Sequence, residues 1–292
     1  MNYIPILKYD LKALNTFFFM RHAQNKFLRN LWITLPADSP VLEMFKNLSI
    51  ELTNRQDRHE RIVKLSRDIT IESKRIIFQL HSSIGKENEA CSVKEASERL
   101  QKLIQGPIRL IGLELQFSPA YLHNRAASPG FQEFIEARTL CHLIQHKQLI
   151  PWQDVQNELV YTINVREGET KTVTTMLPQL DYMLGLSDLT GELMRRTINC
   201  ITTGERSESQ FICSAIQELY TGFLCIYHPP RELARKLSVS RANTMKAESA
   251  MFAVQIRGDK TSPELLAHAI ATQNIHITPI HDDDEDDFYA NY

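Results

Sequence analysis

The sequence predicts an all-α protein, and three observations lead to this fold class. Ten glycines and twelve prolines are few for 292 residues, which argues against many short strands joined by tight turns. Apolar residues recur at helical spacing over long stretches without proline or glycine. A hydrophobic content of 43% beside 23% charged residues is ordinary for a globular protein with one large domain or two small ones.

The first predicted helix is very long. Asp38-Ser39-Pro40 is typical of a helix start, with Ser39 as the cap and Pro40 at the first helical position. From Pro40 to about His81 the chain contains no further proline and no glycine. At 1.5 Å per residue, a helix of about 40 residues is about 60 Å long. Such a length suggests the wall of a bundle or an assembly surface.

Shorter helices are expected along the rest of the chain. Between two of them, residues 160–175 alternate β-branched and polar side chains around a glycine, which allows a small hairpin or an extended loop. The expected helices cover about residues 92–117 (disturbed at Gly106-Pro107), 130–147 (after a break at Ser128-Pro129-Gly130), 177–203, 207–227 and 231–255, with a short one from Pro263.

The chain divides by composition into three regions. We expect residues 1–37 to be a disordered extension, residues 38–275 to form the helical domain, and residues 276–292 to be an acidic disordered tail. The basic residues 1–36 faintly resemble a mitochondrial presequence, but an extension without a targeting role is the favoured interpretation. No apolar run reaches the roughly 18 residues of a membrane helix, so no membrane partner is expected.

Net charge and cysteines exclude some classes of function. The net charge of −2 does not indicate a globally basic nucleic-acid binder, so such a partner would need a local patch. The five cysteines are scattered without a CxxC pair, which favours buried thiols in a reducing compartment. No HExxH, P-loop or GxGxxG motif is present. His142 and His146 share a helix face, but a structural or surface role is the better interpretation.

Two acid pairs at helical spacing are the main candidates for chemistry. Glu133 and Glu136 are i, i+3, while Asp188 and Glu192 are i, i+4, so each pair shares one helix face. Their flanks are apolar, which indicates helices that are partly packed. If the two helices meet, four carboxylates converge and repel one another unless a hard cation such as Mg²⁺ or Mn²⁺ binds. Asp181, two turns before Asp188, could be a fifth member.

The alternative is that each acid pair lies on a solvated face without function, and the pattern alone favours that alternative. A basic stretch in the long helix has a similar ambiguity. Arg58, Arg61, Lys64 and Arg67 step every three residues, which suits either a solvated charged face or contact with phosphates.

Four stretches resemble the translin family, in particular its translin-associated protein X (Trax) members. The most specific is DYMLGLSDLTGELMR at residues 181–195. The others are HERIVKLSRDITIESKR at 59–75, QEFIEA at 132–137, and the segment 236–258. The resemblance covers about residues 39–270 and excludes the leader.

The resemblance implies a bundle of about seven helices with one very long N-terminal helix. It also implies assembly with translin into a hetero-octamer that handles single-stranded RNA and DNA, in the cytoplasm and nucleus. The Trax-like subunit is expected to be an Mg²⁺-dependent endoribonuclease. It promotes activation of the RNA-induced silencing complex by removing the passenger strand.

The family's catalytic and metal-binding acids correspond to Glu133, Glu136, Asp188 and Glu192, although one of them could instead act as a general base. Translin resembles this chain elsewhere but lacks an aspartate at the position of Asp188. The resemblance strengthens the expectation that Arg58, Arg61, Lys64 and Arg67 contact RNA. The alternative is a non-catalytic nucleic-acid-binding or scaffold partner of translin.

Overall fold

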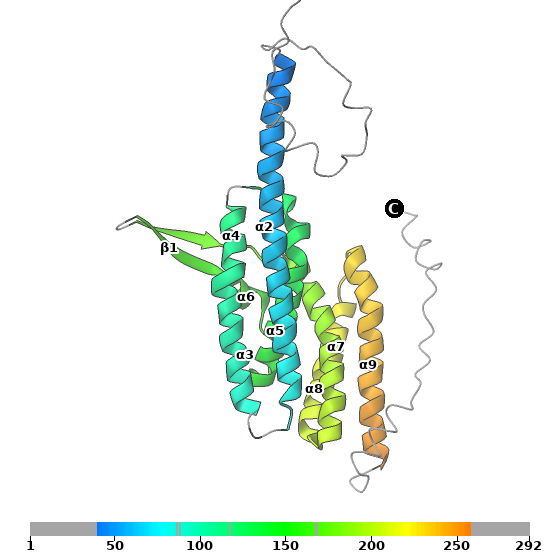
Figure 1. Ribbon diagram of the computed structural model, residues 1–292. Coiled ribbons are helices and arrows are strands. Elements are labelled where there is room, and N and C mark those ends of the chain that lie inside the picture. The colour runs from blue at the N-terminus through cyan, green and yellow to red at the C-terminus, as the bar shows by residue number, and fades with distance from the viewer. Residues whose placement is uncertain (1–39, 86, 88, 117, 167–168, 258–292) are drawn as a thin grey trace, which may run out of the picture. The chain divides into compact units, whose positions relative to one another are not determined.

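A computed structural model describes residues 40–257, except 86, 88, 117 and 167–168 (Figure 1). The described chain is mainly helical, so the predicted all-α fold is confirmed. Two units are separated between Arg55 and Gln56, and residues 40–55 are the described part of the first. The expected extension 1–37, the acidic tail 276–292 and the short helix from Pro263 lie outside the described residues.

The long helix α2 spans Pro40–Ser82, and the predicted cap Ser39 lies outside the described residues. In residues 56–82 it buries Ile62, Ile69 and Ile76 at a spacing of seven, two helical turns, so these side chains share one face. In residues 40–55, six of the apolar side chains that the structure describes are instead exposed, by 45% to 63%. These exposed residues are Val41, Met44, Phe45, Leu48, Ile50 and Leu52.

The expected disturbance at Gly106-Pro107 is confirmed. Helix α3, Glu89–Leu103, passes through a π-helical segment, Ile104–Ile108, into helix α4, Arg109–Leu115. Gly106 has non-helical dihedral angles, and Pro107 has no N–H to donate. The helical direction therefore changes at this point without a separate loop.

The predicted start of the next helix is wrong. Helix α5 spans Asn124–His146, so Ser128-Pro129-Gly130 lies inside the helix rather than before it. Pro129 is close to the helix start, where few carbonyl groups lose a partner. The Gly130 N–H donates to Ser66 Oγ at 3.0 Å, and a Cβ at Gly130 would lie 2.9 Å from the Ser66 carbonyl oxygen. The close packing of Gly130 on α2 therefore outweighs the tendency of the Ser-Pro-Gly sequence to break a helix.

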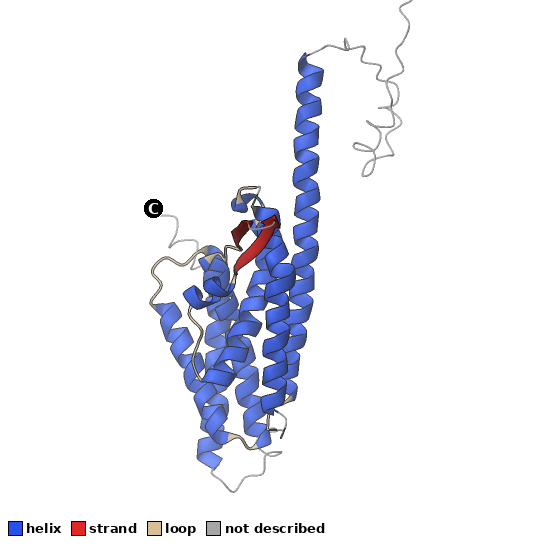
Figure 2. Cartoon of the chain, turned by 90° about the vertical axis from the view of Figure 1, so that its left-hand side faces the viewer, coloured by secondary structure: helices blue, strands red, loops and turns tan. Residues whose placement is uncertain are grey.

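Residues 160–166 and 169–174 pair as the two strands of the hairpin that the sequence left open. Strands β1, Val160–Arg166, and β2, Glu169–Thr174, pair antiparallel with an irregularity between Asn164 and Arg166. Figure 2 shows these strands in red beside the helices. The short helix α6, Trp152–Glu158, precedes them.

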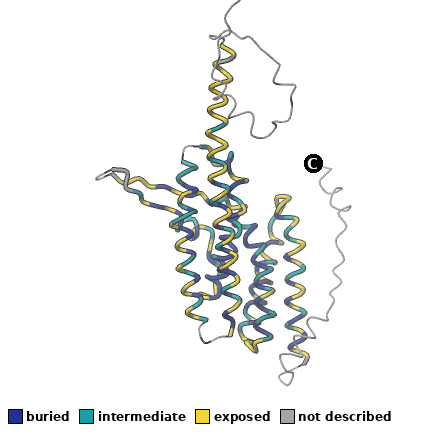
Figure 3. The backbone as a smooth tube through the Cα atoms, viewed as in Figure 1, coloured by how far each residue is buried: buried dark blue, intermediate teal, exposed yellow. Residues whose placement is uncertain are grey.

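Helix α7, Gln179–Thr203, is central to the bundle, because it packs against α5, α8 and α9 (Figure 1). Helices α8 and α9 span Arg206–Leu224 and Arg231–Arg257. Figure 3 shows the buried residues concentrated where these helices meet. A Cβ at Gly185 of α7 would lie 2.8 Å from the Gln132 carbonyl oxygen of α5. Glycine at this position therefore lets α5 and α7 approach closely.

The expectation of buried thiols is wrong for two of the five cysteines. Cys141, Cys200 and Cys213 are buried, but Cys91 and Cys225 are exposed. Cys91 lies in the first turn of α3 and Cys225 follows the last turn of α8, where fewer neighbours cover a side chain. All five are free. Among the described helices, none combines the length and apolar character that a membrane span requires.

Candidate functional site

The four acids singled out in the sequence line one cavity of about 810 Å³. Helix α5 supplies Glu133 and Glu136, and helix α7 supplies Asp188 and Glu192. The expected convergence of the two pairs is therefore observed. It depends on the helical spacing within each pair and on the close α5–α7 approach at Gly185, one turn before Asp188.

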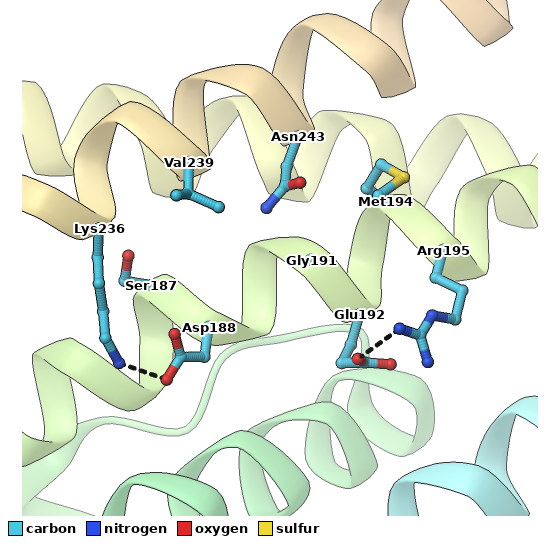
Figure 4. A pocket seen from close by; sticks show the side chains of 9 residues that line it. All are labelled: Ser187, Asp188, Gly191, Glu192, Met194, Arg195, Lys236, Val239 and Asn243. Carbon is cyan, nitrogen blue, oxygen red and sulfur yellow. Dashed lines mark hydrogen bonds and ion pairs between the residues drawn. The ribbon is translucent and has the colours of Figure 1, made fainter. Parts of the chain in front are cut away.

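Basic groups from other helices contact three of these acids. Lys74 Nζ of α2 lies 3.0 Å from Glu133 Oε1, and Lys236 Nζ of α9 lies 2.5 Å from Asp188 Oδ2. His81 Nε2 of α2 lies 2.7 Å from Glu192 Oε2. Figure 4 shows Asp188 and Glu192 on the same side of α7, with Lys236 reaching Asp188 across the helix. Arg195 also contacts Glu192, at 3.4 Å.

No described side chain forms a hydrogen bond or ion pair with the carboxyl group of Glu136, which is the most buried of the four acids, with 9% of its surface exposed. Burial raises the pKa of its carboxyl to about 8, and the neighbouring charges of Glu133, Glu192 and Asp188 add to the effect. For Glu192, burial alone would raise the pKa, but the His81 hydrogen bond and the charge of Arg195 bring it below its usual value. The cavity therefore holds one acid whose negative charge is poorly compensated.

The donor set suits a hard divalent cation, because all four side chains offer carboxylate oxygens. Burial and the nearby charges of Glu133, Glu192 and Asp188 raise the pKa of Glu136, so its ionised form would be stabilised by a cation bound beside it. Within the described residues, however, no three Asp, Glu, His or Cys side chains lie in an arrangement that could hold a metal ion. Glu133 and Asp188 point to lysines instead. The chemistry of the residues fits a metal, but binding one requires these carboxylates to leave their lysine partners.

The suggested fifth acid is part of the support of the site rather than of its lining. Asp181 is 5% exposed and accepts hydrogen bonds from Ser128 and from Gln132 Nε2, the latter at 3.2 Å. Gln132 Oε1 in turn accepts a hydrogen bond from Lys236 Nζ at 3.1 Å. A continuous chain of polar contacts therefore runs from Asp181 through Gln132 and Lys236 to Asp188.

The four predicted RNA-contacting residues fall into two groups. Arg61 donates to both carboxylate oxygens of Glu114, at 2.6 and 2.9 Å, and Arg58 lies 3.7 Å from the same carboxylate. The Arg61 hydrogen bond lowers the pKa of Glu114 despite partial burial. Lys64 and Arg67 are exposed and have no ion-pair partner among the described residues. These two are therefore the better placed for phosphate contact, and the role of all four stays a prediction.

Sequence reasoning did not identify the basic and aromatic side chains around the four acids. Lys74, Phe78 and His81 of α2 line the cavity. Lys236 of α9 reaches Asp188 from an adjoining pocket, which Asp188 and Glu192 also line. The sequence indicated a role for Lys74 and Lys236 only in that both lie in stretches that carry the family resemblance. The rings of His142 and His146 pack together at 4.5 Å, away from this lining.

The fold and the site define a class of protein, a helical bundle in which facing helices direct carboxylates into one cavity. The chain belongs to the translin family, since a model of the Translin family matches residues 57–258. The chain is 32% identical to translin-associated protein X of Rattus norvegicus, over 81% of this chain and 86% of the relative.

Other relatives and solved structures agree with this membership. The translin-associated protein X of Mus musculus is 33% identical over 80% of this chain and 85% of its own length. The Schizosaccharomyces pombe homologue is 29% identical over 73% and 86%. The crystal structure of apo-NeC3PO has a TM-score of 0.56 at 19% identity, covering 73% of this chain and 97% of that one. An AfC3PO–duplex RNA complex has a TM-score of 0.50 at 20% identity, covering 76% and 100%. These two structures confirm the translin-like fold.

Proposed function

We propose that this chain is the Mg²⁺-dependent endoribonuclease subunit of a complex with translin. The observation that carries the proposal is the convergence of Glu133, Glu136, Asp188 and Glu192 in one cavity between α5 and α7. The relatives named translin-associated protein X support the partner. The AfC3PO structure contains duplex RNA, which makes RNA the first substrate to test. Mn²⁺ is the alternative metal, because it shares the preference for oxygen ligands.

The carboxylates, the lysines and Gln132 of the site have different roles in the proposed reaction. The four carboxylates would hold the cation, and the low exposure of Glu136 keeps water from competing for that position. When bound, the cation supplies a water of lowered pKa and stabilises charge on the scissile phosphate. Lys74 and Lys236, released from Glu133 and Asp188, provide positive charge for the phosphates on either side. Gln132 orients the ammonium group of Lys236.

The proposed biological setting follows the family. The complex is a hetero-octamer with translin, acts on single-stranded RNA, and also binds single-stranded DNA. It promotes activation of the RNA-induced silencing complex by removing the passenger strand, in the cytoplasm and nucleus. Co-purification of tagged chain with translin, followed by mass measurement of the complex, tests the stoichiometry directly.

The activity test uses the complex and an end-labelled single-stranded RNA. Cleavage is expected in Mg²⁺ and is expected to stop in EDTA. Glu133→Ala, Glu136→Ala and Asp188→Ala should each lower the cleavage rate by roughly a hundredfold or more, because removing even a supporting residue of a metal site costs 10–100-fold. Glu218→Ala is the matched control, since Glu218 is an exposed acid on α8 outside the cavity.

A non-catalytic binding subunit is the second candidate, and one observation favours it. Lys74 and Lys236 already neutralise Glu133 and Asp188, as in a purely structural ion-pair network. This candidate predicts RNA binding without cleavage in Mg²⁺, and acid variants that assemble and bind normally. Cleavage that survives in all three acid variants would overturn the ribonuclease assignment.

A further inference from the structure

Phe78 is an aromatic side chain on the wall of the acidic cavity, and 74% of its surface is exposed. Its neighbour Ile77 is only 6% exposed, so α2 buries one side chain and presents the next to solvent. Single exposed apolar residues are common on protein surfaces and need no explanation by themselves. The unusual feature of Phe78 is that this exposed ring lines the same cavity as four carboxylates.

The neighbours of Phe78 on the same helix face also line the cavity. Lys74 precedes it by four residues and His81 follows it by three, so the three side chains are adjacent along one face of α2. His81 contacts Glu192, and Lys74 contacts Glu133. The face therefore presents, in order, an ammonium group, an exposed aromatic ring and an imidazole beside the acids.

Lys74 can exchange its partner at low cost. Its side chain is 63% exposed, and an ion pair at such an exposed position adds little to stability. A phosphate is an alternative partner that a lysine ammonium group binds as a point charge. The ammonium group is therefore available to a polyanion that enters the cavity.

An aromatic ring next to a phosphate-binding group suits one chemical class of ligand. Proteins bind single-stranded nucleic acids by stacking unpaired bases on aromatic rings while cationic side chains contact the backbone. Bases within a duplex are already stacked on both faces and are not available to the ring. The arrangement thus favours an unpaired nucleotide over a paired one.

We propose that Phe78 and Lys74 form a nucleotide clamp, in which an unpaired base stacks on Phe78 and an adjacent phosphate contacts Lys74. This inference rests on the proposed function, because it takes the ligand of the cavity to be a nucleic acid. The clamp holds a single strand against the acids of α5 and α7. It makes Phe78 a determinant of single-strand preference without base-sequence preference.

The experiment measures binding rather than cleavage, so that it does not depend on the nuclease assignment. The full chain, purified in the assembly it forms, is titrated in EDTA with a single-stranded RNA that carries 2-aminopurine. Stacking on Phe78 should quench the fluorescence of this base. Phe78→Leu should remove most of the quenching and weaken binding roughly tenfold, the lower range for loss of one stacked base. Phe78→Trp should keep both the quenching and the affinity of the wild type.

Tyr121→Leu is the matched control, because Tyr121 is also 74% exposed but lies outside the cavity lining. It should leave quenching and affinity unchanged. Lys74→Met should reduce the salt dependence of binding by about 0.7 in log–log slope, as expected for one lost phosphate contact on a single strand. With a fully abasic oligonucleotide in place of the RNA, the Phe78→Leu effect on affinity should vanish while the Lys74→Met effect remains.

Three results would overturn the clamp. The first is normal quenching in Phe78→Leu. The second is absence of single-strand binding by the wild-type chain. The third is a change of assembly mass in Phe78→Leu that accounts for the whole loss of affinity, which would assign the ring to a subunit contact. The ribonuclease proposal fails separately, through absence of cleavage in Mg²⁺ by the wild-type complex.

Discussion

Two acids, one near each end of residues 56–82 of α2, have opposite electrostatic environments. Near the start of this segment, Glu114 meets two guanidinium groups, Arg58 and Arg61, and its pKa falls below the usual value. Near its end, Glu136 is buried among three other acids, and the charge of Lys236 only partly offsets their effect, so its pKa rises to about 8. The first acid is satisfied by the fold, whereas the second is left poised for an added cation or proton. The environment of an acid, more than its presence, therefore marks a candidate site.

Replacing Glu136 by glutamine tests whether the negative charge of this acid is uncompensated. Of the changes considered, it should have the largest effect on the free energy of unfolding. A folded-state pKa of about 8, above the usual 4.5, means that the folded protein binds more protons between these values. Stability of the metal-free wild type should therefore fall as pH rises from about 4.5 to 8. The loss is at most several kcal/mol, at about 1.4 kcal/mol for each pH unit. Glu136→Gln should flatten this profile.

The measurement is the midpoint of thermal unfolding in EDTA between pH 5 and 9. Glu218→Ala, outside the cavity, should keep the wild-type slope. Adding Mg²⁺ should stabilise the wild type more at pH 8 than at pH 5, because the cation competes with the proton on Glu136. Parallel profiles for wild type and Glu136→Gln would contradict the assignment of an uncompensated charge to this acid.

Gly185→Ala tests the helix contact that makes the cavity possible. The new Cβ would lie 2.8 Å from the Gln132 carbonyl oxygen and from Ile135 Cβ, so α5 and α7 must separate. Overpacking of this kind costs about 1–3 kcal/mol. Because the separated helices carry the two acid pairs, RNA cleavage should fall even at temperatures where the variant is folded.

Gly222→Ala is the control for Gly185→Ala. A Cβ at this position in α8 meets no atom within 4 Å. Alanine there should stabilise the helix by up to about 1 kcal/mol, since it is the better helix former. Denaturant unfolding of both variants gives the comparison, and equal stability of Gly185→Ala and wild type would show that the close contact is not required.

The smallest effects are expected from the basic residues of α2. Lys64→Met and Arg67→Met should each reduce the salt slope of single-stranded RNA binding by about 0.7, because their side chains are exposed and unpaired among the described residues. Arg61→Met should change the slope less, since its guanidinium group is held by both oxygens of Glu114. An equal change of the salt slope in all three variants would show that RNA displaces Glu114 from Arg61.

Much of the fold could be predicted from local pattern. The uninterrupted course of α2 after Pro40 and the disturbance at Gly106-Pro107 depend on where proline and glycine occur, whose backbone properties act within a few residues. The start of α5 could not be predicted in the same way. There the Gly130 contact with Ser66, more than sixty residues earlier, outweighs a local breaking signal.

The candidate site shows the same division. The sequence by itself determined that Glu133 and Glu136, and Asp188 and Glu192, share helix faces, because the helical repeat makes residues three or four apart neighbours. Only the tertiary structure decided that these faces meet, and that Lys74, His81 and Lys236 reach them from other helices. The physical reason is that contacts between distant segments depend on which helix surfaces fit closely, as at Gly185, and no local spacing specifies that fit.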